Sequence, residues 1–419
     1  MELKLLQVAS ADIAQLSGGM NIRNYYIARH LAQVMSVTHL GLSDRCQPLS
    51  TLRHDGIQLK LFPKPTTYTI GKLARGALGK TPVNLLNYFT FELAAALVQE
   101  LEATHYHTVL LEGVEMSPYL PIVEAYGHGA FVALDWHNIE SELVTRHSSH
   151  ARTPLHRLYM QRAASQLKRI EAEMLESCHF HIVTSQRESD QLLSIRPQAS
   201  VAVVENGVDL SLFDHWTGVQ AINSIALRNR LLFVGAMDYS ANVSAVYEFA
   251  TGTWPKIHAA FPQLVFTIVG RNPSASIREL AFRPGIAVTG TVDDVRPYYQ
   301  EAFAAVVPLR VGGGTRLKIL EAMAAGVPVI STSLGAEGLR VRPDIHLILA
   351  EGPDEFFQKL VALRRNPRWW QQLSTAGREL VKSTYDWSSI GARLVEVYLE
   401  RLTRWIKLTG NAPESARAI

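Results

Sequence analysis

The chain has 419 residues, of which 47% are hydrophobic and 19% are charged. This length predicts two or three domains with a large buried core, and the composition excludes a disordered or low-complexity protein. The 41 Lys and Arg residues exceed the 38 Asp and Glu residues by only three, which does not indicate a nucleic-acid-binding protein. The sequence contains no apolar run close to the roughly 20 residues that a membrane-spanning helix needs.

The basic residues are unevenly distributed along the sequence. Residues 56–91 contain five Lys or Arg residues and no acidic residue. We expect this segment to contact an anionic membrane near a lipid-linked acceptor; the alternative is an acceptor-binding loop without a lipid role. Cys46 and Cys178 are the only cysteines, and neither belongs to a CxxC pair, which favours a cytoplasmic protein, at the inner face of the membrane if that contact exists. The first residues predict a strand and not a signal peptide.

Short apolar runs alternate with amphipathic helical patterns in chain order. The runs are 4–8, 37–42, 107–111, 131–134 and 180–184, followed by a second series at 231–235, 264–270, 303–309 and 327–331. Helices are expected at 21–34, 84–103, 154–177 and 388–407. Strands that alternate with helices indicate an α/β fold, here two Rossmann-like, doubly wound parallel-sheet domains.

A turn-rich sequence, VENGVD at 204–209, is the best candidate for a domain boundary. We therefore expect an N-terminal domain over 1–205, a C-terminal domain over 206–385, and a final helix and tail over 386–419. The last helix has one apolar face, so it must pack against another part of the protein.

The most informative segment is VGGGTRLKILEAMAAGVPVIST, residues 311–332. Gly312, Gly313 and Gly314 follow an expected buried strand, and Thr315 is expected to open a helix. Such a loop lets backbone N–H groups approach an anion at a helix N-terminus, and phosphate is the natural ligand.

Helical spacing places Lys318 and Glu321 on the same face as Gly314. A diphosphate would then meet the loop amides and a basic side chain, while Glu321 would accept hydrogen bonds from ribose hydroxyls. The alternative is a tight glycine turn with Lys318 and Glu321 as a surface ion pair.

Seven segments occur in an order that resembles a known family. They are SGG (17–19), LDWHNIESEL (134–143), VVENGVDLSLF (203–213), LLFVGAMDYSANV (231–243), FTIVGRNP (266–273), VTGTVDDVRPYY (288–299) and GGGTRLKILEAMAAGVPVIST (312–332). With this series the chain resembles the retaining glycosyltransferases of family 4, the group 1 glycosyl transferases. It is most similar to the branch associated with bacterial exopolysaccharide and envelope glycan synthesis.

The resemblance implies the GT-B fold, with two domains facing across a cleft and a C-terminal helix that crosses back to the N-terminal domain. It implies transfer of a sugar, with retention of configuration, from a nucleoside diphosphate sugar held by the C-terminal domain. The acceptor, a glycan or a lipid-linked molecule, would be held by the N-terminal domain. A metal-binding DxD motif of the other glycosyltransferase fold is absent from the sequence, so we expect no metal and no cofactor beyond the donor.

The resemblance also assigns roles to single residues. His137 matches a family histidine beside the donor sugar, although a structural hydrogen bond is the alternative. Gly290 and Thr291 are expected near the donor base, or else form an ordinary turn. Gly18 and Gly19 are either a phosphate-approach loop or a plain turn.

The sequence departs from the family pattern in two places. The family usually has two glutamates separated by seven residues; Glu321 matches the second, and Gly313 replaces the first. The family's Arg and Lys after the LLFVG strand are also missing, and Asn242 lies in that region among the expected donor-binding residues. We infer that Arg316 and Lys318 supply the missing positive charge and act in catalysis. A catalytically silent sugar-nucleotide-binding partner and a sugar-nucleotide epimerase remain as alternatives.

Overall fold

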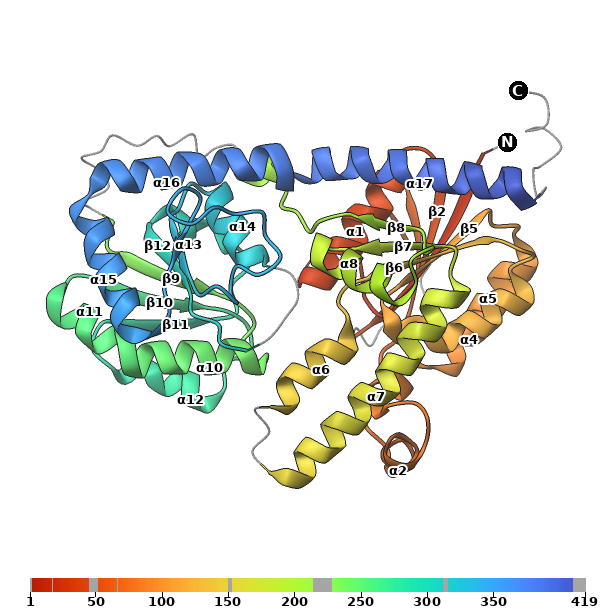
Figure 1. The fold of residues 1–419 in the computed structure, drawn as a ribbon, viewed down its shortest axis with the longest axis horizontal. Helices are drawn as coiled ribbons and strands as arrows, with labels where there is room; N and C mark the ends of the chain where they lie inside the picture. The colour runs from red at the N-terminus through yellow and green to blue at the C-terminus, as the bar shows by residue number, and fades with distance from the viewer. Residues whose placement is uncertain are drawn as a thin grey trace. The chain divides into compact units, whose positions relative to one another are not determined.

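The computed structural model describes residues 2–16, 18–44, 52–65, 67–149, 153–213, 228–311 and 316–409. The described residues form two compact units, shown with their elements in Figure 1. Unit 1 contains the residues up to Glu205 and those from Ile390 onward, and unit 2 contains those between Asn206 and Ser389. Two α/β units with parallel sheets confirm the predicted fold class.

Unit 1 is built on an eight-stranded sheet in the order β3-β4-β2-β1-β5-β6-β7-β8. All of its neighbouring strands are parallel except β3, which pairs antiparallel with β4 at the edge. The strands are β1 (Lys4–Ala9), β2 (Ser36–Ser43), β3 (Leu52–His54), β4 (Ile57–Pro63), β5 (Thr108–Glu112), β6 (Phe131–Trp136), β7 (Phe180–Val183) and β8 (Val201–Val203). Because β2 lies on one side of β1 and β5 on the other, the strand order reverses direction at β1, which is where doubly wound sheets bind ligands.

Helices cover both faces of this sheet. They are α1 (Gly19–Leu31), α2 (Ile70–Leu78), α3 (Val83–Tyr88), α4 (Phe91–Ala103), the 3-10 helix η1 (Val114–Tyr119), α5 (Leu120–Tyr126), α6 (Glu140–Ser148), α7 (Pro154–Ser177) and α8 (Gln186–Ile195). Leu6 and Val8 of β1 pack in one core cluster with side chains of α4, α5 and α7. Successive strand residues point to opposite faces, so Gln7 points to the other face, where it bonds to α1.

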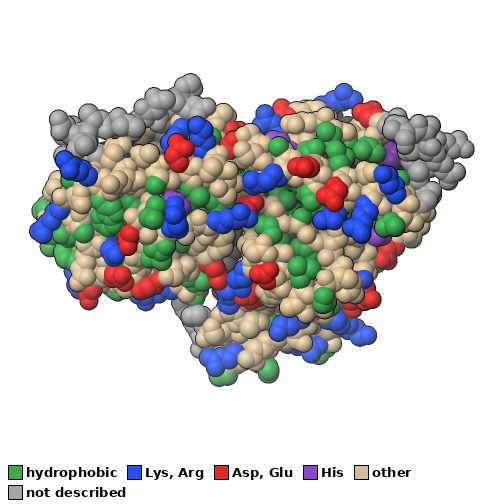
Figure 2. Space-filling view, turned by 45° about the horizontal axis from the view of Figure 1, so that its top comes forward, with side chains coloured by type: hydrophobic (Ala, Val, Ile, Leu, Met, Phe, Trp, Pro, Cys, Tyr) green, Lys and Arg blue, Asp and Glu red, His purple; other side chains and the backbone are tan. Residues whose placement is uncertain are grey.

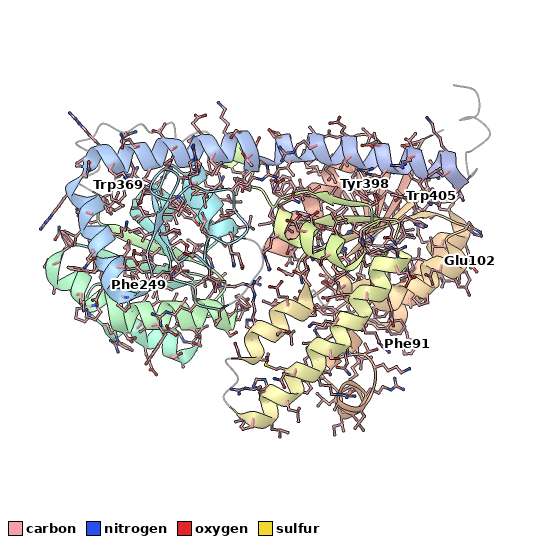
Figure 3. All side chains as sticks on the ribbon, in the orientation of Figure 1. Phe91, Glu102, Phe249, Trp369, Tyr398 and Trp405 are labelled. Atoms are coloured by element: carbon pink, nitrogen blue, oxygen red, sulfur yellow. The ribbon has the colours of Figure 1, made fainter. Side chains whose placement is uncertain are left out.

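The last helix, α17 (Trp387–Thr409), begins in unit 2, and most of it belongs to unit 1. The Tyr398 hydroxyl lies 2.7 Å from Oγ1 of Thr108 in β5, and its ring makes edge contacts with Phe131 and Phe180. Trp405, about two turns further along, also contacts Phe131 (Figure 3). The apolar face of this helix thus packs on the N-terminal domain's sheet, as predicted.

Unit 2 contains a six-stranded parallel sheet in the order β11-β10-β9-β12-β13-β14. The strands are β9 (Arg230–Val234), β10 (Val265–Val269), β11 (Ile286–Gly290), β12 (Ala302–Val307), β13 (Val329–Ser331) and β14 (Ile348–Leu349). The strand order reverses at β9, between β10 and β12. This unit therefore repeats the doubly wound arrangement of unit 1.

The helical segments of unit 2 pack on both faces of its sheet in two apolar clusters. They are η2 (Leu210–Phe213), α10 (Ser240–Glu248), η3 (Phe249–Thr253), α11 (Trp254–Ala260), α12 (Ala275–Glu279), η4 (Leu280–Phe282), α13 (Arg296–Gln300), α14 (Leu317–Ala324), α15 (Gly352–Arg365), α16 (Pro367–Leu380) and η5 (Val381–Tyr385). Among the described residues of both units, no helix combines the length and the apolar composition needed to cross a bilayer.

Two sequence-based boundaries are wrong. The single helix expected over 84–103 is two helices, because Thr90 is extended and its hydroxyl caps the second one by accepting a hydrogen bond from the Leu93 N–H. The helix expected to open at Thr315 begins at Leu317. Thr315 itself lies outside the described residues.

Candidate functional site

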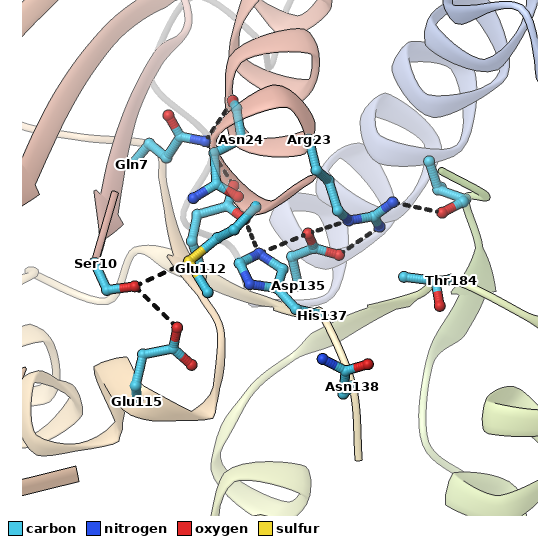
Figure 4. Close-up of polar contacts among 12 residues, drawn as sticks. Gln7, Ser10, Arg23, Asn24, Glu112, Glu115, Asp135, His137, Asn138 and Thr184 are labelled. Atoms are coloured by element: carbon cyan, nitrogen blue, oxygen red, sulfur yellow. Dashed lines mark hydrogen bonds and ion pairs between the residues drawn. The ribbon is translucent and has the colours of Figure 1, made fainter. Parts of the chain in front are cut away.

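A buried polar cluster lies at the carboxyl ends of three neighbouring strands of unit 1, as Figure 4 shows. Glu112 is the last residue of β5 and stands directly opposite Asp135 in β6. His137 follows the end of β6, so the sheet register brings all three side chains together. The cluster lies at the carboxyl ends of β1, β5 and β6, beside the point where the strand order reverses. That point is the ligand-binding position of this sheet type.

The His137 imidazole lies between the two carboxylates. Its Nε2 atom is 3.1 Å from Oε2 of Glu112 and 3.4 Å from Oδ2 of Asp135. Burial alone would lower the pKa of His137, but hydrogen bonds to Asp135 and Glu112 outweigh it and raise the pKa to about 10. His137 is therefore a fixed positive charge at neutral pH.

Arg23 of α1 neutralises Asp135. The guanidinium donates from Nε and from one terminal nitrogen to the two carboxylate oxygens, at 2.6 Å each, and another terminal nitrogen donates to the Val204 carbonyl oxygen. Both side chains are buried, and the bidentate geometry is the strong form of this pair. Burial would raise the pKa of Asp135, but the Arg23 charge holds it below its usual value.

Glu112 is held from its other side by Gln7 of β1. The Gln7 amide donates to Oε1 of Glu112 at 2.6 Å. Burial, and then the neighbouring Asp135 charge, raise the pKa of Glu112 to about 7. Next to this pair, the Ser10 hydroxyl lies 2.9 Å from Oε1 of Glu115. Every acidic side chain in the cluster thus has a defined donor.

Glu112, Asp135 and His137 bring three ligand-type atoms within 4.8 Å of one another, so a metal ion has to be considered. Asp135 uses both oxygens for Arg23, and Glu112 accepts from Gln7 and His137. A bound cation would have to compete with two positive groups, the Arg23 guanidinium and the His137 imidazolium. These residues form a charge network and do not fit a metal centre.

A second polar group lies in unit 2, on one face of α14. The Lys318 ammonium donates to Oδ1 of Asn242 at 2.7 Å and sits 4.9 Å from the centre of the Phe233 ring. One turn further along, Oε2 of Glu321 accepts a hydrogen bond from the Tyr299 hydroxyl at 3.0 Å. The structure thus brings Lys318, Glu321 and Asn242 together beside β9, where the strand order of unit 2 reverses.

Lys318 and Glu321 are partly exposed, yet protein surrounds both charged groups closely. Burial, and then the Arg316 charge, lower the pKa of Lys318 to about 7. Burial raises the pKa of Glu321 to about 7 in spite of the Tyr299 hydrogen bond and the Lys318 charge. Both groups therefore titrate near neutral pH.

Arg316 directly precedes α14 and is buried. One of its terminal nitrogens donates to the Leu334 carbonyl oxygen at 2.8 Å and lies 3.7 Å from a Glu337 carboxylate oxygen. In this structure the guanidinium thus holds the segment that follows β13.

The predicted glycine positions are only partly described. Gly312, Gly313, Gly314 and Thr315 lie outside the described residues. Gly18 is extended and precedes α1, whose first residue is Gly19.

The remaining predicted positions lie at the end of β11. Gly290 has φ +73°, a conformation that favours glycine, and a Cβ atom built on it would have no heavy atom within 4 Å. Thr291, which follows, is exposed. The backbone at Gly290 is therefore open to a ligand.

Sequence reasoning missed Arg23, Glu112, Gln7 and Tyr299. Glu112 had a usable signal, because it directly follows an apolar run predicted as a strand, so it had to lie at the carboxyl edge of the sheet. Arg23, Gln7 and Tyr299 gave no such signal, since their partners are 112, 105 and 22 residues away in sequence.

A comparison with protein families finds a match for most of unit 2. The model of the family described as Glycosyl transferases group 1 matches residues 228–366. Residues 228–366 are thus similar to the group 1 glycosyl transferases. The resemblance proposed from the sequence motifs is confirmed, and the matched region contains Asn242, Arg316, Lys318 and Glu321.

Curated relatives share about half of their length with this chain. The chain is 29% identical over 201 residues to the phosphatidyl-myo-inositol mannosyltransferase of Mycobacterium leprae, covering 46% of this chain and 52% of that protein. It is also 29% identical over 240 residues to the D-inositol 3-phosphate glycosyltransferase of Thermobispora bispora, covering 53% and 55%. The chain spans about half the length of the curated relatives it matches.

Solved structures are similar over nearly the whole chain. Sucrose-phosphate synthase from Thermosynechococcus elongatus has a TM-score of 0.73 at 19% identity, covering 96% of this chain and 100% of that one. HepE of Anabaena, in complex with UDP and glucose, has a TM-score of 0.67 at 13% identity, covering 95% and 100%. The chain therefore has the GT-B fold that the motifs implied.

Proposed function

We propose that this chain transfers a sugar from a nucleoside diphosphate sugar to a glycan or lipid-linked acceptor, with retention of the anomeric configuration and without a divalent metal. The observation that carries the proposal is the family match over 228–366, because it includes the helix that bears Lys318 and Glu321. Sugar transferases among the relatives support the reaction class.

Unit 2 supplies the donor site in this proposal. Glu321 offers its second carboxylate oxygen to the ribose hydroxyls, while Tyr299 holds the first. The Lys318 ammonium, fixed by Asn242, lies one turn nearer the N-terminus of the same helix and meets the diphosphate. The open backbone at Gly290 receives the base, which would extend past Thr291.

Arg316 supports the departure of the diphosphate. Arg316 immediately precedes α14 and follows the glycines in sequence, and in this proposal its guanidinium meets the negative charge that collects as the sugar leaves. Preorganised donors of this kind stabilise the transition state more than the ground state. The hydrogen bond to Leu334 supports this role by restricting the side chain before the donor binds.

Unit 1 contributes a charged His137 at the end of β6. Its charge is fixed by Glu112 and Asp135, so the imidazolium can remain beside the donor sugar through the reaction without changing protonation. Arg23 and Gln7 hold those two carboxylates and act as positioning residues.

The proposed acceptor rests on the names of the relatives. One relative's name includes a phosphatidylinositol and another's an inositol phosphate. We extend the proposal to a lipid-linked or glycan acceptor in bacterial polysaccharide synthesis, on the cytoplasmic side of the membrane.

A panel of nucleotide sugars tests the reaction. The donor that raises the Tm of the purified chain is identified first, since only a ligand of the folded state stabilises it. That donor is then incubated with glycan and lipid acceptors in the presence of EDTA, and the anomeric configuration of the product is determined by NMR. Release of nucleoside diphosphate with a product of retained configuration is expected.

Other outcomes identify the alternatives. Donor binding without turnover with any acceptor indicates the silent binding partner, which the Gly313 replacement motivates. A changed sugar on the recovered nucleotide indicates an epimerase. Turnover that EDTA abolishes contradicts the metal-independent mechanism.

A further inference from the structure

Helix α2 of unit 1 presents its apolar side to solvent. Ile70, Leu73 and Leu78 are 85%, 48% and 84% exposed. At 100° per residue these three side chains occupy one side of the helix, together with the exposed Ala74 and Ala77. A surface helix of a globular protein normally turns such a face toward the core.

The opposite side of α2 packs on the protein with polar and small residues. The Lys72 ammonium donates to Oδ1 of Asn87 at 3.2 Å. Gly76 is buried against Val83, and a Cβ atom at position 76 would lie 2.7 Å from the Val83 Cβ. Helix α2 is therefore amphipathic, but its apolar side faces solvent and its polar side faces the protein.

The start of α7 adds a second apolar stripe. Leu155 and Leu158 are 77% and 64% exposed, and Tyr159 follows on the same side at i+4. The C-terminal end of α2 is tied to α7 because Arg162 donates to the Gly79 carbonyl oxygen at 3.1 Å.

A second set of contacts fixes the same junction. The Gln166 amide donates to the carbonyl oxygens of Gly76 and Gly79, at 3.1 and 2.8 Å. The two helices are thus joined by hydrogen bonds at the C-terminal end of α2. We name their exposed apolar residues the α2–α7 surface: Tyr68, Ile70, Leu73, Leu78, Leu155 and Leu158.

The two sequence segments that contain this surface have Lys and Arg as their only charged residues. Residues 56–91 contain five Lys or Arg residues, residues 143–170 contain six, and neither segment contains an Asp or Glu. The remainder of the chain consequently has a net charge of −8, although the whole carries +3. Figure 2 shows Lys, Arg and hydrophobic side chains together on the lobe at its lower edge.

We propose that the α2–α7 surface docks on an anionic phospholipid bilayer. The apolar side chains enter the boundary between headgroups and acyl chains, and the surrounding cations meet lipid phosphates. The charge argues for this occupant, because an apolar protein partner or a second copy of this chain would gain nothing from the exposed cations Arg75, Lys80, Arg157 and Arg162. A second copy would bring the same positive charge and be repelled.

The docking surface is independent of sugar transfer. Its residues are outside the clusters of Glu112 and Lys318, and its test measures binding without turnover. Loss of docking and loss of transferase activity can therefore be observed separately.

The test is sedimentation of the full chain with large vesicles of phosphatidylcholine, with or without phosphatidylglycerol. The parent is expected to bind the anionic vesicles and to be released by 0.5 M salt. Ile70→Ser/Leu73→Ser/Leu78→Ser should weaken binding at least tenfold. Arg75→Glu/Arg157→Glu should do the same, since each cation near such a surface contributes about fivefold.

A matched variant controls for the loss of exposed apolar area. Ile195→Ser/Phe282→Ser removes two highly exposed apolar side chains elsewhere and should bind like the parent. Every variant is first checked for an unchanged Tm. Equal binding to neutral vesicles, no binding to either kind, or parent-like binding by the triple serine variant would overturn the proposal. So would a parent dimer that the triple variant dissociates, which would make the surface a contact between copies.

Discussion

The two polar clusters occupy equivalent places in two similar sheets but handle charge in opposite ways. In unit 1, Arg23 and His137 face Asp135 and Glu112, so buried charges are paired. In unit 2, Lys318 contacts a neutral amide and an aromatic ring, and Glu321 contacts a phenol. The first cluster pairs its acidic groups with cationic groups of the protein, whereas the second retains charges that lack a full counter-charge from the protein.

This difference shows which cluster is prepared for a charged ligand. A paired network has little to gain from a new ion, because its own groups already satisfy one another. Lys318 and Glu321 both have pKa values of about 7. A bound diphosphate would supply the counter-charge for Lys318, and ribose hydroxyls would supply hydrogen bonds to Glu321. We therefore expect changes in unit 1 to affect mainly stability and protonation, and changes in unit 2 to affect mainly donor binding and turnover.

The largest expected effect is that of Arg23→Met. It leaves Asp135 buried without its guanidinium, and breaking a buried pair from one side costs about 3 to 5 kcal/mol. Urea denaturation should show that loss in the free energy of unfolding. Lys256→Met is the control, because it breaks an exposed ion pair with Asp354 and should cost less than about 1 kcal/mol. Equal losses in the two variants would contradict the buried network.

Arg316→Ala should reduce kcat about 100-fold, which is about 2.7 kcal/mol of transition-state stabilisation. Donor affinity should change much less, and Arg316→Lys should recover part of the turnover. Because Arg316 also bonds to the Leu334 carbonyl oxygen, the Tm of each variant is measured alongside. A kcat within about threefold of the parent would make Arg316 a purely structural residue.

Protonation of His137 should make the free energy of unfolding depend on pH. The folded pKa of about 10 lies above the ordinary value of about 6.5, so its stabilising contribution is complete below pH 6.5. The free energy of unfolding should fall by up to about 1.4 kcal/mol per pH unit as the pH rises toward 10. His137→Gln should remove this slope. A parallel decline in parent and variant would assign the slope to other groups.

The smallest effect is expected for Glu321→Gln. Loss of a charged hydrogen bond to ribose should weaken nucleoside diphosphate binding about tenfold in calorimetry. Glu279→Gln alters an exposed glutamate of the same unit and should leave the affinity unchanged. Unchanged affinity in Glu321→Gln itself would exclude Glu321 as the ribose anchor.

Local patterns were sufficient to predict much of the fold. The strand expected at 131–134 is present in β6, and the helix expected at 154–177 has those bounds, because Thr153 caps it and Pro154 starts it. Strand β4, between β3 and β2, was missed, since its alternation includes Lys60, whose ammonium is paired with Glu100 in the fold. A contact 40 residues away in sequence cannot be inferred from the strand itself.

In the candidate sites, too, local spacing could be predicted and contacts between distant segments could not. Lys318 and Glu321 could be placed on one face because helical spacing is local. The Asn242 contact with Lys318 and the Arg23 contact with Asp135 depend on how the sheet brings distant segments together. Arg316 was expected to face the glycine loop, and its contact with Leu334 could not be foreseen, because no sequence rule links the two positions.

The packing of α17 has a consequence for the order in which the chain can acquire structure during synthesis. Tyr398 seals the sheet of unit 1 against Thr108 and Phe131, which leave the ribosome almost 300 residues earlier. All of unit 2 is translated in between. Domains usually fold in the order of their synthesis, but here the first unit to be started is the last to be closed. Until residue 398 emerges, the side chains of Phe131 and Phe180 lack the ring of Tyr398 that packs on them in the folded protein.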